Sequence, residues 1–382
     1  MRHGRLRAIL PLLICIPLLA FRVQLLLTPL PLLDFMTYWA AGHMFLSGGD
    51  PYSMGGTYAI YRSFGWPYVQ QFVMTAPPWA MPLVALFALL PFHVAHSSWF
   101  AASLILEGTS SVALWRYFGG EKRQQWMALL VLATFLPAAA AEHYGQITPL
   151  ILVGITGFLF ALRRKQYVLA GVFLFLFSLK PHLLYLVLLA ILLWSIQNKK
   201  WFVPITASLM VAGTLLGAIA FNRNVLVYFH GTVHAAMDMK CGVGGALRSV
   251  FGEQHEWLQF LPCVPGCIWF AFYWTRYRRC WKWEERLPLL LLVSIASAPY
   301  FWVHDFVLGI PALIALGVQV ERVKAWHIAA VLYLVVQELI LAGGALRAAS
   351  VASLLWIVLY FVILRLCPIG EGATIEPSPA VG

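Results

Sequence analysis

Asp34 is the first acidic residue of the chain, and it directly follows an apolar segment in which Leu and Pro dominate. A carboxyl group at the edge of a hydrocarbon layer is poorly solvated, which favours its neutral form and raises its pKa. A carboxylate with a raised pKa can act as a general base near neutral pH. Asp is also a favoured N-cap residue, so a helix cap is an equally good interpretation of Asp34, and the two roles are compatible.

Polar residues also interrupt later apolar segments. Lys180 ends an apolar run before Pro181; a charge at such depth is costly and usually faces a cavity, and the alternative is a lysine that snorkels to the interface. His304 and Asp305 lie between two apolar segments. They fit either a functional pair or a structural histidine oriented by Asp at a helix cap. Gln146 could bind a substrate or satisfy a helix end.

The segment from Lys240 to Arg248 is rich in glycine, but it is not a Walker sequence and follows no strand signal. It therefore does not predict a nucleotide site, and a mobile loop that closes over a substrate is the sharper hypothesis. Asp50 precedes Pro51 and fits a turn as well as a binding role. Most Trp and Tyr residues are interpreted as a belt at the membrane interface, where a few rings could stack on sugars.

The composition predicts an all-α integral membrane protein. Of 382 residues, 61% are hydrophobic and 11% are charged, and the mean hydropathy is +0.80, whereas about a quarter of a soluble domain is charged. The net charge of +11 does not indicate nucleic-acid binding, because Lys and Arg collect in the cytoplasmic loops of membrane proteins.

A spanning helix needs about 20 mostly apolar residues. Residues 8–27 resemble a signal peptide, but Pro29 and Pro31 follow in place of a cleavage site, so an uncleaved first span over 8–30 is expected. Further apolar segments lie at 76–92, 94–117, 126–141, 147–162, 167–180, 182–197, 201–221, 261–275, 287–300, 305–320, 326–343 and 350–366. They predict one transmembrane domain over residues 1–367 with about 11–13 spans, followed by a disordered tail at 368–382.

The basic turns predict which ends of the spans share a side. Positive charge gathers in the N-terminus, 163–165, 199–200, 276–286 and 322–324, which we place in the cytoplasm. By alternation, a long first loop at 31–74, the turns at 142–146, 180–182 and 299–305 and a second loop at 222–260 lie outside. The segment 116–123 is also basic, yet it falls outside if 76–92 and 94–117 are two full spans. One of them is then re-entrant, or the charge bias fails there.

The six cysteines are scattered and form no metal-binding pattern. We expect free thiols, with a bridge from Cys241 to Cys263 or Cys267 as the alternative if that loop is extracytoplasmic.

Several motifs resemble glycosyltransferase family 87 in order and spacing. Asp34-Phe35-x-x-Tyr38-Trp39-Ala40-Ala41-Gly42 with Gly48-Gly49-Asp50-Pro51-Tyr52 resembles its first-loop signature. The later matches are Ala76-Pro77-Pro78 with Leu90-Pro91-Phe92, Gly145-Gln146 with Arg163-Arg164, Leu169-Ala170-Gly171 with Leu179-Lys180-Pro181, and Ser297-Ala298-Pro299-Tyr300 with His304-Asp305. Ala76 replaces the usual aromatic residue and Ala298 is inserted.

The resemblance implies a GT-C bundle that transfers a sugar, typically mannose, from a polyprenyl phosphate in a single inverting displacement. The first-loop Asp would deprotonate the acceptor hydroxyl. A phosphate leaving group needs positive charge and hydrogen-bond donors rather than a general acid, for which Lys180, His182, Arg248 and His304 are candidates. From the resemblance and the residues together, we assign catalysis to Asp34 and His304, and substrate binding to Tyr38, Asp50, Gln146, Lys180, His182, Lys240, Arg248 and Asp305.

The sequence therefore predicts a membrane hexosyltransferase of the plasma (inner) membrane with its active site on the extracytoplasmic side. Its expected partners are a polyprenyl-phosphate sugar, an envelope glycolipid or glycan acceptor and membrane lipids. No cofactor or metal is expected, since no DxD motif for a nucleotide-sugar–metal complex occurs. The alternatives are transfer of another polyprenyl-linked sugar, and a transporter or flippase; a transporter would show two similar halves with paired broken helices.

Overall fold

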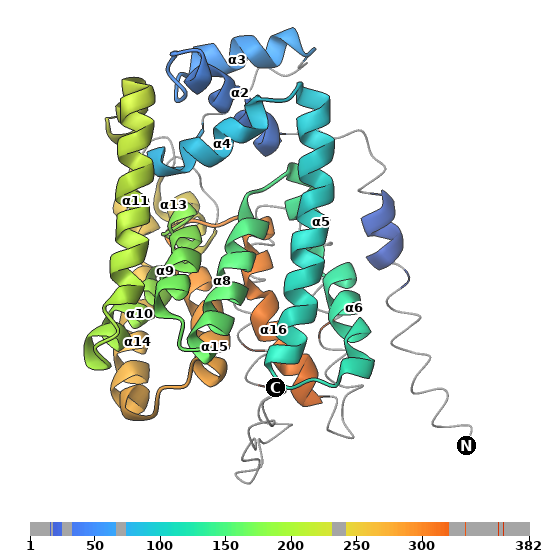
Figure 1. The fold of residues 1–382 in the computed structure, drawn as a ribbon, viewed down its shortest axis with the longest axis vertical. Helices are drawn as coiled ribbons and strands as arrows, with labels where there is room; N and C mark the ends of the chain where they lie inside the picture. Colours follow the sequence, from blue (N-terminus) through green and yellow to red (C-terminus); the bar gives the residue numbers. More distant parts are fainter. Residues whose placement is uncertain are drawn as a thin grey trace.

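The computed structural model describes residues 33–65, 74–230 and 242–320, together with residues 16, 18–24, 333, 358 and 362. All secondary structure in this part of the chain is helical, which confirms the all-α prediction (Figure 1). Its α-helices are α2 (Leu33–Leu46), α3 (Met54–Ser63), α4 (Met81–Ala88), α5 (Phe92–Tyr117), α6 (Trp126–Thr134), α7 (Leu136–Tyr144), α8 (Thr148–Arg163), α9 (Tyr167–Phe175), α10 (Tyr185–Gln197), α11 (Phe202–Phe221), α13 (Gly242–Phe251), α14 (Cys263–Tyr277), α15 (Trp283–Ala296) and α16 (Ile310–Val320). Its 3-10 helices are η1 (Pro78–Ala80), η2 (Lys122–Gln124), η3 (Leu176–Leu179), η4 (Arg223–Phe229), η5 (Glu256–Gln259), η6 (Arg278–Cys280) and η7 (Val303–Gly309).

The helices are those of a membrane protein. Within the described residues, α11 is long and apolar enough to cross a membrane unaided, and the pairs α4–α5 and α6–α7 each qualify as a bent span. Four shorter apolar helical segments accompany them. Large apolar side chains such as Phe202, Leu209 and Leu216 on α11 are exposed, as a lipid-facing surface requires. The segments 326–343 and 350–366 lie almost wholly outside the described residues, so the predicted number of spans stays a prediction.

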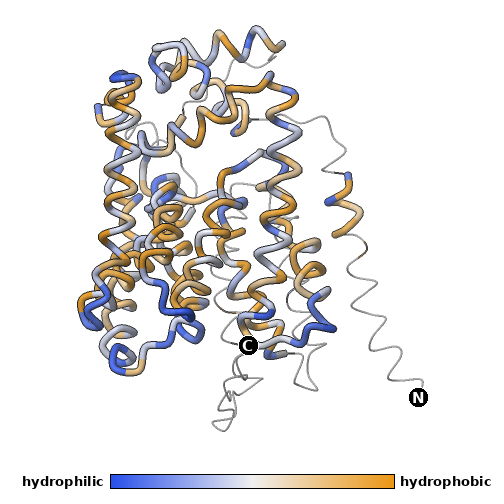
Figure 2. Tube along the Cα trace, in the orientation of Figure 1, coloured by the Kyte–Doolittle hydropathy of each residue, from blue (hydrophilic) through white to orange (hydrophobic). Residues whose placement is uncertain are grey.

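A sharp bend explains the basic segment at 116–123. The η1–α4 helix makes an angle of 113° with α5, and its 11 residues (Pro78–Ala88) cover only about 16 Å. Residues 76–92 therefore do not form a full span, and α4 and α5 together make one bent span or a re-entrant segment followed by α5. This agrees with the alternative in which one of the two segments is re-entrant. The hydrophilic turns after α5, α8, α10 and α14 consequently gather at one end of the bundle, opposite α2 and α3 (Figures 1 and 2).

Close packing of small residues brings the helices together. A Cβ on Gly171 of α9 would lie 2.5 Å from the Cβ of Thr206 on α11, and a Cβ on Gly42 of α2 would lie 2.8 Å from the Val84 carbonyl oxygen of α4. Such contacts replace the hydrophobic driving force that helices lack in lipid. Both glycines belong to the sequence motifs. These motifs therefore contain residues needed for helix packing as well as candidate site residues.

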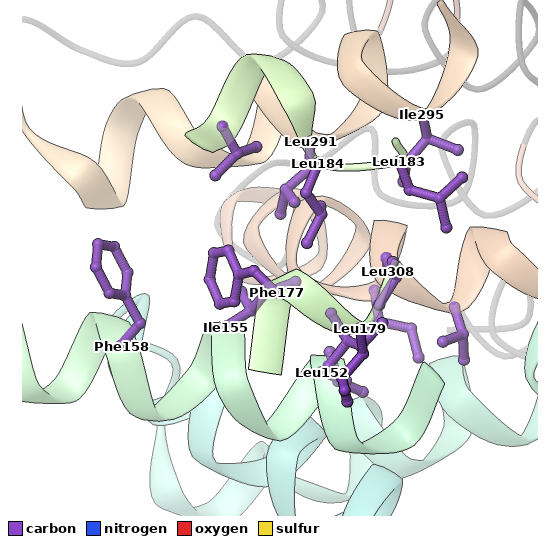
Figure 3. Close-up of a cluster of buried hydrophobic side chains, with 14 of the residues drawn as sticks. Leu152, Ile155, Phe158, Phe177, Leu179, Leu183, Leu184, Leu291, Ile295 and Leu308 are labelled. Atoms are coloured by element: carbon purple, nitrogen blue, oxygen red, sulfur yellow. The ribbon is translucent and has the colours of Figure 1, made fainter. Parts of the chain in front are cut away.

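A buried aliphatic and aromatic cluster surrounds the chain on both sides of Lys180. Figure 3 shows Leu179, Leu183 and Leu184 among side chains from α8, α15 and η7, and each of the three is at most 1% exposed. The other labelled members are Leu152, Ile155, Phe158, Phe177, Leu291, Ile295 and Leu308. This cluster fixes the backbone that carries the lysine.

The two predicted outer loops contain ordered helices. In the first, the chain forms α2 and α3, and Asn222 at the end of α11 holds the turn after α2 by donating from Nδ2 to the carbonyl oxygens of Phe45 (3.0 Å) and Gly49 (2.8 Å). In the second, the segment 242–248 forms the start of α13, so the prediction of a loop there is wrong. A Cβ on Gly244 would lie 2.4 Å from the Gln259 carbonyl oxygen, which shows that this glycine serves helix packing.

The cysteines in the described part of the chain are free thiols: Cys263, Cys267 and Cys280. Neither predicted partner of Cys241 is therefore bridged, and Cys241 lies outside the described residues, as do Lys240 and the predicted tail at 368–382.

Candidate functional site

Asp34 is the second residue of α2, so it lies inside the first helical turn and not at the N-cap. An anion there interacts favourably with the helix dipole. Its side chain leaves the helix and accepts a hydrogen bond at Oδ2 from Nε2 of Gln146. Burial raises the pKa of Asp34 to about 6, against the opposing effects of the Lys180 charge and the Gln146 hydrogen bond. The carboxyl group thus has the acidity of a base that works near neutral pH.

Gly145 makes the contact between Asp34 and Gln146 possible. It ends α7 in the left-handed conformation with φ 67°, which glycine adopts without strain. A Cβ at this position would lie 2.5 Å from the Cβ of Phe35. The helix end therefore comes directly against the residue next to Asp34, and Nε1 of Trp99 fixes it by donating to the Gly145 carbonyl oxygen at 3.2 Å.

Gln146 joins the base to a cation. While its Nε2 donates to Asp34, its Oε1 accepts from Lys180 Nζ at 2.8 Å and from the Tyr38 hydroxyl at 3.3 Å. This orientation of the amide gives each polar atom a complementary partner. Asp34 and Tyr38, one helical turn apart on α2, therefore face the same glutamine.

Lys180 forms a buried ion pair with Asp305 of η7. Its Nζ lies 2.6 Å from Asp305 Oδ1, and the two side chains are 16% and 2% exposed. The other carboxylate oxygen of Asp305 accepts from the Trp302 backbone N–H at 2.9 Å. Asp305 thus orients Lys180. The sequence analysis had treated the two residues as separate substrate-binding groups. An ammonium has three donors, and two are used here, so one remains for a ligand.

Two histidines flank this ion pair. Nε2 of His304 lies 3.9 Å from Asp305 Oδ1 and accepts or donates no hydrogen bond within the described part of the chain, and its ring contacts Tyr144 and Trp302. His182 stacks on Tyr300, with ring centroids 4.1 Å apart. Burial lowers the pKa of His182 to about 4, so this imidazole is neutral at pH 7.

Three other predicted site residues are not joined to this set by any described contact. Asp50 Oδ1 accepts from the Tyr52 backbone N–H at 2.9 Å, which is the turn-forming role. Arg248 is 3% exposed and donates from Nη1 to Gln259 Oε1 at 2.6 Å and from Nη2 to the Glu253 carbonyl oxygen at 2.9 Å. It links α13 to η5. Lys240 lies outside the described residues.

The sequence analysis missed the partners that hold the site together. Trp302 and Tyr144 contact Asp305 and His304, and Asn222 holds the Gly49 turn. Tyr144 precedes the Gly145-Gln146 motif directly, which is a signal that could have been used. Nothing in the sequence relates Asn222 to the first loop. Within the described residues, no cluster of His, Cys, Asp and Glu is of a size to hold a metal ion.

A comparison with protein-family models identifies the family of this chain. The model of glycosyltransferase family 87 matches residues 75–303. The chain belongs to this family. No curated protein and no solved structure matches it. The matched range contains Gln146 and Lys180. His304 and Asp305 follow its end directly, whereas Asp34 lies well before its start. These three residues are connected to the matched region by the contacts described above.

A glycosyltransferase can use each part of this arrangement. Asp34 can accept a proton, and Gln146 keeps its carboxylate apart from the Lys180–Asp305 pair. The remaining Lys180 donor and the His304 Nε2 can bind an anionic leaving group. The proton-accepting Asp34 and the anion-binding Lys180 are therefore separated by one glutamine in the same chain of hydrogen bonds.

Proposed function

We propose that this family 87 member transfers a hexose, specifically mannose, from a polyprenyl-phosphate donor to a glycolipid or glycan acceptor of the cell envelope. The observation that carries the proposal is the hydrogen-bonded chain Asp34–Gln146–Lys180–Asp305. It offers one base and one anion-binding group, and the described residues offer no metal cluster of the kind that a nucleotide-sugar donor would use. Membrane lipids surround the bundle and accommodate the polyprenyl chain.

The proposed reaction is one inverting displacement. The acceptor hydroxyl oxygen forms a bond to C1 of the sugar, the bond between C1 and the phosphate oxygen breaks, and the hydroxyl proton passes to Asp34. The leaving phosphate keeps the electron pair of the broken bond. Its growing charge is stabilised by the third N–H of Lys180 and by His304 with a proton on Nε2.

We place the active site on the extracytoplasmic side of the plasma (inner) membrane. The support is the charge distribution: basic turns gather at the end of the bundle opposite α2 and α3, and such turns face the cytoplasm (Figure 2). A polyprenyl-phosphate sugar suits that side, because it needs no cytosolic nucleotide.

The test is transfer in proteoliposomes that contain the purified protein. Polyprenyl-phosphate mannose, glucose, galactose and aminoarabinose are supplied singly with an envelope-lipid extract, and GDP-mannose and UDP-glucose serve as nucleotide-sugar controls. We expect loss of the lipid-linked mannose and appearance of a mannosylated product. Turnover of a nucleotide sugar alone would overturn the proposed donor class, and preference for another lipid-linked sugar would overturn the proposed hexose.

A further inference from the structure

Three ionisable side chains meet inside the helical bundle, apart from the chain of bonds at Asp34. Glu107 on α5 is 0% exposed, Glu142 on α7 is 1% exposed and Arg22 is 8% exposed. Arg22 forms an ion pair with Glu142 through Nη2 and donates from Nη1 to the Leu132 carbonyl oxygen at 2.6 Å. Ionisable groups at such depth are costly, and they are usually retained for a function.

If both glutamates are ionised, the described residues offer too few hydrogen-bond donors for their carboxylate oxygens. Glu107 lies within hydrogen-bonding reach of Glu142. Yet both carboxylate oxygens of Glu107 and Oε2 of Glu142 receive no donor from the described residues. Two carboxylates are acceptors only, so they repel each other unless one of them carries a proton.

Among the described residues, the elements that pack on α5 and α7 bring no second lysine or arginine to this cluster. The helices α6 and α16 pack on α5 and carry no ionisable side chain, and α8 has only Arg163, at its basic end. On α5 itself, the positions four residues before and three and four residues after Glu107 are the neutral, buried Ser103, Ser110 and Ser111. On α7, His143 follows Glu142, and α2 contributes Asp34 and His43. The helix η7, which also packs on α7, contributes His304 and Asp305, which are engaged with Lys180 and its surroundings.

We propose that Glu107 and Glu142 form a proton-binding site that holds one shared proton at neutral pH. The proton sits between the two carboxyl groups, so that Glu107 donates to Glu142 while Glu142 accepts from Arg22. The positive charge of Arg22 then balances the single negative charge shared by the two glutamates, and the shared proton supplies a hydrogen-bond donor between their carboxyl groups. The shared proton ties α5 to α7, and Arg22 ties residues 18–24 to α7, whose end carries Gly145 and Gln146. The site rests on these contacts and not on the proposed sugar transfer.

The test is chemical labelling with dicyclohexylcarbodiimide, an apolar reagent that reacts with protonated carboxyl groups in apolar surroundings. The intact purified protein is labelled in lipid, digested and mapped by mass spectrometry. We expect the label on Glu107 or Glu142, and a fall in labelling when the pH is raised. Glu121, an exposed glutamate at the basic end, should stay unlabelled and is the internal control.

Glu107→Gln provides the decisive comparison, because its amide can still donate to Glu142 and leaves the Arg22 pair intact. It should remain folded and should lose the label at both positions, whereas Glu121→Gln should change nothing. Infrared spectroscopy gives an independent measurement that does not need access of the reagent. In the difference between the spectra of the parent and Glu107→Gln, which cancels the band of protonated Asp34, the variant should have lost a C=O stretch of a protonated carboxyl group. A difference spectrum without this lost band would overturn the proposal.

Discussion

Opposing effects set the acidity of Asp34. Burial disfavours its charged form, whereas Lys180 and the Gln146 hydrogen bond favour it, and the resulting pKa is about 6. Because the folded protein binds this proton more tightly than the unfolded chain does, the ionised carboxylate is destabilising above pH about 6. Under the proposed function, this loss of stability accompanies a base that works near neutral pH.

This acidity predicts the acid limb of the pH profile. A base must be deprotonated, so the value of kcat/KM for the donor should fall as the pH drops through about 6, by about tenfold per pH unit below it. The measurement is initial-rate kinetics between pH 4.5 and 8 at fixed ionic strength. A profile that is flat through this range would show that Asp34 does not titrate in the rate-limiting step.

Lys180 is predicted to act on the leaving phosphate. Lys180→Ala should slow turnover, because it removes transition-state stabilisation on the order of 2–4 kcal/mol, by analogy with the loss of one oxyanion donor. Lys180→Arg should rescue only part of it, because a planar guanidinium differs in shape from an ammonium. Donor and acceptor are varied separately, with Lys199→Ala at the basic end as the control. An effect confined to the acceptor's apparent affinity would assign the lysine to the acceptor site.

At the scale of elements, the end of α7 decides whether Asp34 meets its partner. Gly145→Ala would put a Cβ 2.5 Å from that of Phe35 and add roughly 1–2 kcal/mol for the left-handed conformation. We expect a lower melting temperature and a large loss of turnover. Gly213→Ala is the matched control, since its Cβ meets nothing within 4 Å and it gains about 1 kcal/mol of helix propensity. Equal behaviour of the two variants would contradict this role of Gly145.

Sequence reasoning selected residues that the structure brings together, but it did not predict their contacts. The order and spacing of the motifs located Asp34, Gln146 and Lys180, which the structure joins by hydrogen bonds. The roles of Asp305 and Arg248 were not predictable, because each depends on which partner the folded backbone presents: Lys180 for the first and Gln259 for the second.

The sequence analysis also missed the helix α13 and the role of Glu107, each for a physical reason. The glycines of 242–248 have the composition of a loop, but their lack of side chains serves the packing of α13 on its neighbours. Glu107 was missed altogether, because its meaning depends on the approach of α7 and Arg22 from distant parts of the sequence. Local patterns report periodicity and turns, and they do not report such long-range pairs.

At the scale of the whole molecule, the bend between α4 and α5 accounts for the position of the basic turn that follows α5. With α4 lying across the end of the bundle, the basic turn after α5 joins the other basic turns (Figures 1 and 2). This gathering of basic turns at one end is the distribution that the positive-inside bias leads us to expect. Hydropathy alone could not show this, since the apolar run through Pro91 has the composition of two spans.

This arrangement predicts which thiols are accessible from outside the cell. Ser47→Cys in the turn after α2 should react with a membrane-impermeant maleimide on intact cells. The native Cys280, exposed at the basic end, should react only after permeabilisation. Labelling is quantified by mass spectrometry of the two peptides. The reverse pattern would place Asp34 on the cytoplasmic side.

The most direct test of the account is the turnover of Asp34→Asn. Asparagine keeps the size and can accept the hydrogen bond from Gln146, but it cannot take a proton from the acceptor hydroxyl. We predict a protein that inserts, folds and is no less stable than the parent, yet shows no detectable transfer of the lipid-linked sugar. Asp50→Asn, which removes a carboxylate from the neighbouring turn, should retain transfer. Normal turnover by purified Asp34→Asn would contradict the assignment of Asp34 as the base.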